Sequence, residues 1–165
     1  NDKTEILASY QRDIGIFRGA ASYGYLRKRF SNPLLKGFNG LVFQGQLWWY
    51  ATPLLTVSAA GGRSLENSGV PTVGVVATYA VRSQVDYELL RNFVLTAQLS
   101  ERRQYFSEIS QRTRTRTQEI KGEYRFNRTV AIGAYGRHEC KDSTDTSQIR
   151  GFCSSLIGMS LTLKQ

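Results

Sequence analysis

The chain has 165 residues, with 22 Lys and Arg against 13 Asp and Glu, a formal net charge of +9, 41% hydrophobic residues and a mean hydropathy of −0.35. This length suits one domain, and the apolar content is sufficient for a folded core, which excludes a disordered or collagen-like chain. No run approaches the roughly 18 to 20 consecutive apolar residues of a membrane-spanning helix, which leaves a soluble domain or a β-barrel.

The chain starts with a polar and charged segment, residues 1–5, that lacks the basic and then apolar pattern of a signal peptide. We therefore expect any leader to have been removed or to lie further upstream. The first predicted strand covers residues 4–11, rich in residues that suit a sheet.

Interruptions between the predicted strand segments recur along the whole chain. Short polar or Pro-containing breaks centre near Asp13, Thr52, Arg91 and Asn127. Longer loop-like stretches alternate with them, at residues 31–36, 63–71, 105–112 and 141–150. The segments between the breaks are rich in Val, Ile, Thr, Tyr, Phe and Trp and lack the apolar stripe of a helix. The sequence therefore predicts about nine antiparallel strands joined by alternating short and long connections.

Apolar and polar residues alternate within these segments. In residues 38–50, Leu41, Phe43, Leu47 and Trp49 fall on one parity, and the other parity is mixed. In residues 119–126 the charged side chains all fall on one parity. Because successive side chains of a strand point to opposite faces, each strand has one apolar and one polar face.

Alternation alone fits both a soluble ligand-binding barrel with its apolar face inside and a membrane barrel with its apolar face outside. The predicted strands have roughly 12 to 16 residues, more than the 5 or 6 of ordinary sheets and enough to cross a bilayer. Short turns at one end, long loops at the other and aromatic residues near strand ends are typical of outer-membrane barrels. We therefore predict an all-β, antiparallel up-and-down transmembrane β-barrel.

Three segments carry a resemblance to a known family: residues 47–57, 85–95 and 122–128. Each places a predicted periplasmic turn between two spanning strands, and together they are similar to the putative β-barrel porins of Gram-negative outer membranes. The resemblance covers most of the chain from about Ala8 onward. It implies a barrel in the bacterial outer membrane and a role beside exopolysaccharide synthesis and export.

The predicted topology leaves the barrel incomplete. If the short turns face the periplasm, the first strand begins at the outer surface, whereas bacterial single-chain barrels have an even strand count with both ends periplasmic. We therefore expect residues 1–165 to be a single, partial barrel domain, the C-terminal part of a larger barrel with at least one N-terminal strand missing. The missing strands come from the same precursor or from another chain. Residues 156–163 resemble the C-terminal signal read by the barrel-assembly machinery, without its terminal aromatic residue.

Two cysteines, Cys140 and Cys153, flank the last long stretch. A hairpin would bring them opposite each other on the same face, at a separation that suits a disulfide. The periplasm and the cell surface are oxidising, and a disulfide closing such a loop stabilises a protein by about 3 kcal/mol in the chain-entropy model. We predict a disulfide rather than two free thiols.

Catalytic and metal-binding candidates are few. His138, the only histidine, has Cys140 and carboxylates nearby, but the spacing matches no metal motif and favours an ordinary histidine at the barrel rim. The sequence contains no acyl-transfer, zinc-protease or phosphate-loop motif. We therefore expect no enzyme activity and no cofactor.

Basic residues concentrate at the predicted outer strand ends. Arg112, Arg114 and Arg116 lie on one side of a strand, and their guanidinium groups suit phosphate or carboxylate. Lipopolysaccharide is the nearest such anion, and solvated charge without a ligand is the alternative. Nucleic acid is not expected as a partner, because the aromatic residues follow strand parity rather than a stacking groove.

Charged residues also occupy the predicted lumen parity. They are Arg18, Arg82, Asp86, Glu119, Lys121, Glu123, Arg125 and Arg137. Such a wall can line a pore that passes acidic solutes, or it can fill a sealed polar core with cross-strand ion pairs. The total number of strands decides between an open pore and a sealed core, since barrels of about 8 to 10 strands leave almost no channel, whereas barrels of about 16 to 18 strands leave an aqueous one.

These observations predict a porin-like channel that passes exopolysaccharide or anionic solutes. The alternative is a non-conducting barrel with a structural or anchoring role inside a larger cell-envelope assembly. The expected partners are outer-membrane lipid, lipopolysaccharide and the missing strands.

Overall fold

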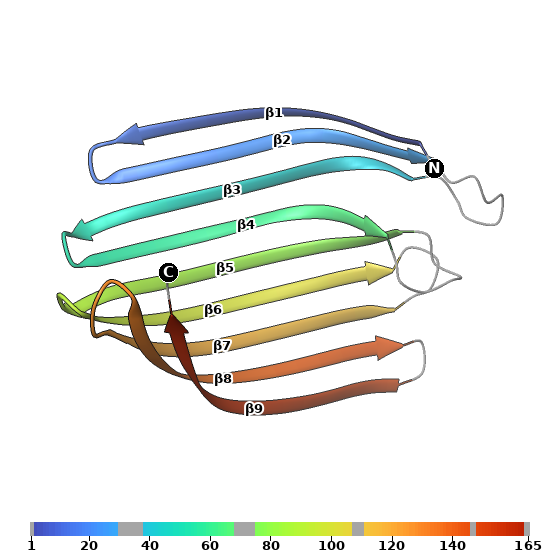
Figure 1. Ribbon diagram of the computed structural model, residues 1–165. Coiled ribbons are helices and arrows are strands. Elements are labelled where there is room, and N and C mark those ends of the chain that lie inside the picture. The colour runs from blue at the N-terminus through green and yellow to red at the C-terminus, as the bar shows by residue number, and fades with distance from the viewer. Residues whose placement is uncertain (1, 30–37, 68–74, 107–110, 146–147, 164–165) are drawn as a thin grey trace.

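In the computed structural model, the described residues, 2–29, 38–67, 75–106, 111–145 and 148–163, form nine antiparallel strands of one sheet, and each strand pairs with the next in sequence (Figure 1). The strands are β1 (Asp2–Ile14), β2 (Phe17–Arg29), β3 (Phe38–Thr52), β4 (Leu55–Asn67), β5 (Val75–Leu90), β6 (Phe93–Phe106), β7 (Arg112–Arg125), β8 (Val130–Asp145) and β9 (Gln148–Leu163). The predicted up-and-down all-β architecture is confirmed. No helix in the described part of the chain is long and apolar enough to span a membrane.

The four short connections lie at one end of the sheet (Figure 1). Each falls within about two residues of a predicted break. Gly15 begins the β1–β2 turn with a φ of +56°, a conformation that glycine adopts without steric cost. The Thr52 hydroxyl accepts hydrogen bonds from the Leu54 and Leu55 amides at 3.2 and 3.0 Å. These local contacts fix the turns and with them the register of the hairpins.

Two of the predicted loops are shorter than expected. β4 continues to Asn67, although the sequence predicted a loop from residue 63. β8 continues to Asp145 and β9 begins at Gln148, although a loop was predicted over 141–150. The two loop predictions were wrong for the same reason. Where a strand extends beyond the apolar band of the barrel, polar side chains occur on both of its faces, and a run of polar residues is typical of a loop. The first strand is likewise longer than predicted, at Asp2–Ile14.

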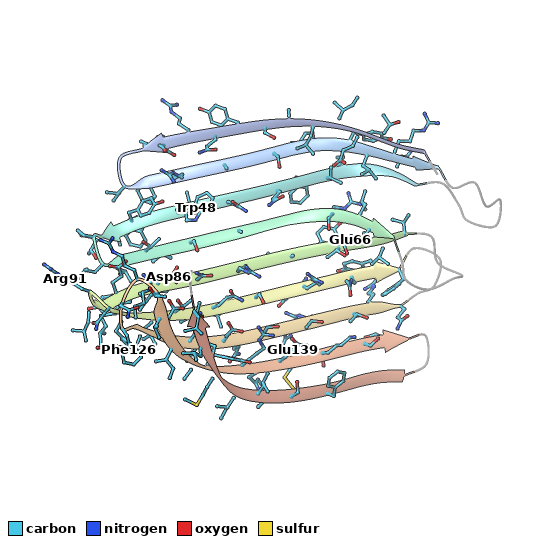
Figure 2. The ribbon with its side chains drawn as sticks, viewed as in Figure 1. Trp48, Glu66, Asp86, Arg91, Phe126 and Glu139 are labelled. Carbon is cyan, nitrogen blue, oxygen red and sulfur yellow. A yellow bond between two sulfur atoms is a disulfide. The ribbon has the colours of Figure 1, made fainter. Side chains whose placement is uncertain are left out.

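The sheet is curved, and its inner face is polar. Cross-strand register aligns one transverse row of side chains over eight strands. The row consists of Arg18, Trp48, Ser58, Gln84, Gln98, Glu119, Arg137 and Leu156. A cavity of about 1070 Å³ lies against this face, lined by such polar residues as Gln98 and Arg137. Trp48, Asp86 and Glu139, on β3, β5 and β8, are labelled in Figure 2.

The outer face carries the apolar residues predicted to contact lipid. Ile157 and Met159 are 87% and 76% exposed, which would be costly in water and is favourable in a bilayer. Near the short turns Phe17 stacks on Trp49, with ring centroids 6.2 Å apart. Aromatic side chains at this level match the interfacial girdle of outer-membrane barrels.

The sheet is open along β1 and β9, which lie at its opposite edges (Figure 1). Among the described residues, neither strand pairs with a second neighbour. The register elsewhere is regular, with irregularities only next to the β3–β4 and β5–β6 turns among the described strands.

Candidate functional site: the inner wall and the outer basic cluster

The inner wall contains all eight charged residues predicted for the lumen. Arg18, Arg82 and Asp86 lie on β2 and β5, Glu119, Lys121, Glu123 and Arg125 on β7, and Arg137 on β8. Their common facing follows from strand parity, so the sequence pattern was sufficient to find them.

Most of these charges are neutralised by close partners. Arg137 Nη2 lies 2.6 Å from Glu119 Oε2. Glu123 accepts from Lys121 Nζ at 2.9 Å and from Arg125 Nε at 3.0 Å. These pairs lie on the inner face of the sheet, where exposed ion pairs contribute about 0.2–1 kcal/mol each, so they shape the wall more than they stabilise it.

Among the described residues, the Asp86 carboxylate pairs with neutral hydrogen-bond donors and with no cation. It accepts hydrogen bonds from Gln84 Nε2 at 2.8 Å and from Thr96 Oγ1 at 2.7 Å. Near the short turns, Arg18 Nε pairs with Asp13 Oδ1 at 3.0 Å. The carboxylates of Asp86 and Asp13 therefore have fixed hydrogen-bond donors.

Three cations on the wall are different. Arg82, Arg102 and Lys141 are exposed, line the cavity and form no ion pair with any residue that the structure describes. Arg102 and Lys141 are both in register with Thr115 on the strand between them, and Arg82 is in register with Ser100, two residues before Arg102. We call these three residues the inner cation group.

The surroundings of the inner cation group are mostly neutral and polar. Ser100, Thr115 and Thr117 lie between its members on the wall. Glu139 lines the same cavity, and it accepts a hydrogen bond from the Thr117 hydroxyl at 3.3 Å. The sequence analysis did not assign Arg102 and Lys141 to the wall, although the parity of β6 and β8 places them there.

The outer face has its own basic cluster. Arg112, Arg114 and Arg116, predicted as outer-rim anion contacts, lie on the parity of Ile120 and therefore face outward. Register adds Arg63 on β4 and Arg103 on β6 to the same surface. We call these five arginines the outer basic cluster. Sequence parity alone does not join Arg63 and Arg103 to the other three, because their position beside β7 depends on cross-strand register.

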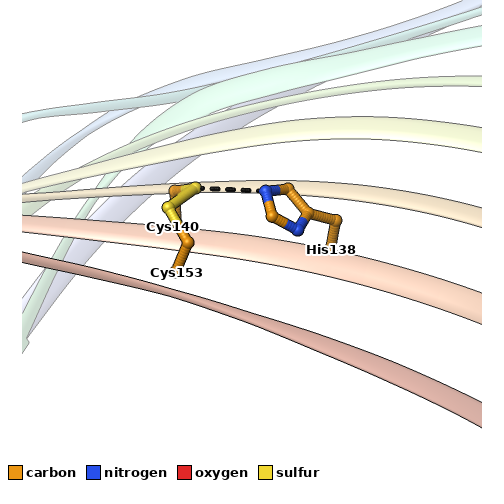
Figure 3. A group of neighbouring side chains, drawn as sticks. All are labelled: His138, Cys140 and Cys153. Carbon is orange, nitrogen blue, oxygen red and sulfur yellow. Dashed lines mark hydrogen bonds between the residues drawn. A yellow bond between two sulfur atoms is a disulfide. The ribbon is translucent and has the colours of Figure 1, made fainter.

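Cys140 and Cys153 form a disulfide, as predicted (Figure 3). They are directly opposite each other on β8 and β9. The group of His138, Cys140 and Cys153 is close enough to hold a metal ion, with ligand atoms within 4.8 Å of one another. However, the two sulfur atoms are bonded to each other, and metal binding requires thiolates. His138 Nε2 lies 3.3 Å from Cys140 Sγ, and its Nδ1 lies 2.9 Å from the Ser155 hydroxyl.

Comparison with known proteins agrees with this geometry. Residues 13–165 match the model of the family described as Putative beta-barrel porin 2. The fold is similar to OmpT, an outer membrane protein of Vibrio cholerae folded in vitro, with a TM-score of 0.62 and 13% sequence identity. The similarity covers 94% of this chain and 55% of that one. No curated protein is matched by sequence. The family and the fold point to the bacterial outer membrane.

Proposed function

This chain belongs to the Putative beta-barrel porin 2 family and is a porin-like outer-membrane β-barrel, and we propose that the complete barrel conducts anionic solutes. The observation that carries the proposal is the inner cation group, Arg82, Arg102 and Lys141. These three side chains form no ion pair with any residue that the structure describes, whereas the carboxylates of Glu119, Glu123 and Asp86 have partners. Fixed cations in a narrow aqueous passage raise the local concentration of anions.

Conduction requires more strands than nine. The two open edges support completion by further strands, because each unpaired backbone group in hydrocarbon costs several kcal/mol. The chain spans only about half of the similar OmpT structure, with 55% covered. A barrel with the chain length of OmpT and with the same number of residues per strand as this chain would have about 16 strands, within the range that leaves an aqueous channel.

The chemistry of the wall bears on the solute. Arginine binds carboxylate and phosphate through paired N–H donors, and the serine and threonine hydroxyls between the three cations offer hydrogen bonds to neutral oxygens. An acidic polysaccharide carries both kinds of group. The proposal therefore includes the passage of polysaccharides only where the polymer carries carboxylate or phosphate groups.

The test is charge reversal in the full-length protein. We expect Arg82→Glu combined with Arg102→Glu to move the reversal potential in planar bilayers toward cations, because two fixed charges in the passage change sign. Arg91 lies in the β5–β6 turn, outside the passage, so Arg91→Glu is the matched control and should change little. Equal shifts in both variants would argue against a selectivity site at Arg82 and Arg102. A complete absence of conductance would favour a structural or anchoring barrel.

A further inference from the structure

The outer basic cluster lies on the surface of the sheet opposite to the proposed passage, so it has no role in conduction. Arg63, Arg103 and Arg114 occupy one transverse row: Arg63 and Arg103 are each in register with Tyr79, and Arg103 is in register with Arg114. With neighbouring strands about 4.8 Å apart, the row spans roughly 15 Å. Arg112 and Arg116 flank Arg114 on the same face of β7.

The level of the cluster along the barrel follows from strand geometry. Arg103 lies ten residues along β6 from Phe93, and Arg114 lies eleven residues along β7 from Arg125. At a rise of about 3.4 Å per residue and a tilt of about 40°, both lie roughly 26 to 29 Å above the short-turn end. The apolar band of such barrels is about 25 Å tall, so the cluster lies at its outer edge, at the level of lipid headgroups.

The cluster has more positive charge than its carboxylates can neutralise. Glu101 contacts Arg103, and its second oxygen lies 2.6 Å from Arg114 and 3.7 Å from Arg116. Asp142 is the register partner of Arg114 on β8. Counting Glu101 and Asp142, the five arginines retain a surplus of about three positive charges, from the charge each side chain carries at pH 7.

Two members of the cluster have aromatic rather than anionic neighbours. The Arg63 guanidinium lies 5.5 Å from the ring centre of Tyr79, and that of Arg112 lies 5.6 Å from the ring centre of Tyr105. The Arg63 and Arg112 guanidinium groups therefore lie beside aromatic rings, which suit the membrane interface.

Arginine on the lipid-facing side of a barrel is unfavourable at the bilayer midplane and is tolerated at the interface, where headgroup phosphates lie within reach of its N–H donors. We propose that the outer basic cluster binds the phosphate groups of lipopolysaccharide in the outer leaflet. Charge complementarity carries the assignment: a row of guanidinium groups at headgroup level matches a phosphorylated glycolipid. The inference rests on the outer-membrane location and does not depend on conduction.

The direct test is a titration of the full-length protein in detergent with bis-phosphorylated lipid A, followed by native mass spectrometry. Lipid A without phosphates loses its charge-assisted hydrogen bonds to the arginines, so we expect it to bind at least about tenfold more weakly. Equal binding of the two lipids would overturn the proposal. Inorganic phosphate at the same concentration should not displace the lipid, and displacement would overturn the assignment to a glycolipid.

Matched variants locate the site. Arg103→Gln with Arg114→Gln should weaken binding at least about tenfold, since two charged donors are lost. Arg82→Gln with Arg102→Gln removes the same charge from the inner wall and should leave lipid binding unchanged. Equal losses in both pairs would exclude the outer basic cluster as the site.

A third variant works in the opposite direction and guards against misfolding. Glu101→Gln removes the carboxylate that competes for three arginines, so it should strengthen the binding of bis-phosphorylated lipid A several-fold. Weaker binding by a folded Glu101→Gln protein would contradict the proposal even if the arginine variants fail to fold.

Discussion

Substitution of Leu47 by arginine tests the assignment of the outer face to lipid. Leu47 is 49% exposed on the outer face of β3, between Gly19 and Ala59 of the neighbouring strands. It lies five residues from Thr52, at the short-turn end of the strand. With a rise of about 3.4 Å per residue and a tilt of about 40°, its height is roughly 13 Å, close to the middle of an apolar band about 25 Å tall.

An arginine at the midplane of a barrel surface destabilises the fold by about 2–4 kcal/mol, and this is the cost we expect for Leu47→Arg. Gln46→Arg is the control at nearly the same depth. Gln46 faces the inner wall between Ala20 and Ala60, where small neighbours leave room for arginine beside water, so we expect a cost below about 1 kcal/mol.

The assay is the urea dependence of folding of the full-length protein into lipid vesicles, measured by tryptophan fluorescence. A difference of about 2–4 kcal/mol corresponds to roughly 30- to 700-fold in the folding equilibrium. Equal costs at both positions, or a larger cost for Gln46→Arg, would refute the assignment of the two faces.

Three further changes probe other parts of the molecule. Nonreducing peptide mapping should recover Cys140 linked to Cys153, and alkylation of both cysteines without reduction would contradict the disulfide. Reduction should accelerate amide exchange in residues 141–144 but not in residues 130–136. Glu123→Gln frees the two cations it pairs, so it should increase anion preference in planar bilayers, and an unchanged preference would place Glu123 outside the conducting path. Gly15→Ala should destabilise the barrel by about 1 kcal/mol in urea titrations, because alanine at a φ of +56° is strained; an unchanged midpoint would show that the turn can adopt another conformation.

Parity and spacing carried most of the information in the sequence. Alternation at residues such as Phe43 and Gln44 was sufficient to predict which face is apolar, because a strand has a fixed period of two. Recurring breaks located the short turns because those turns contain residues with specific roles, such as Thr52 as an acceptor of backbone N–H groups.

Interactions between strands could not be predicted in the same way. Glu101 contacts arginines on both β6 and β7, and the choice of partners depends on the register between strands rather than on sequence separation. Arg102 and Lys141 lie on the inner parity of β6 and β8, but only the register of both with Thr115 shows that they are neighbours on the inner wall. The strand ends at Asn67 and Asp145 were missed because polar residues above the membrane lack the alternation that marks a strand.

The central claim is that the complete barrel encloses an open, anion-preferring passage, and the zero-current potential of the unmodified full-length protein tests it most directly. We expect stepwise conductance in planar bilayers and, across a tenfold KCl gradient, a potential whose sign indicates chloride preference. This preference should weaken as the mean salt concentration rises, because the Debye length falls from about 10 Å at 0.1 M to about 3 Å at 1 M. An insulating barrel, or a potential whose sign indicates potassium preference, would contradict the account.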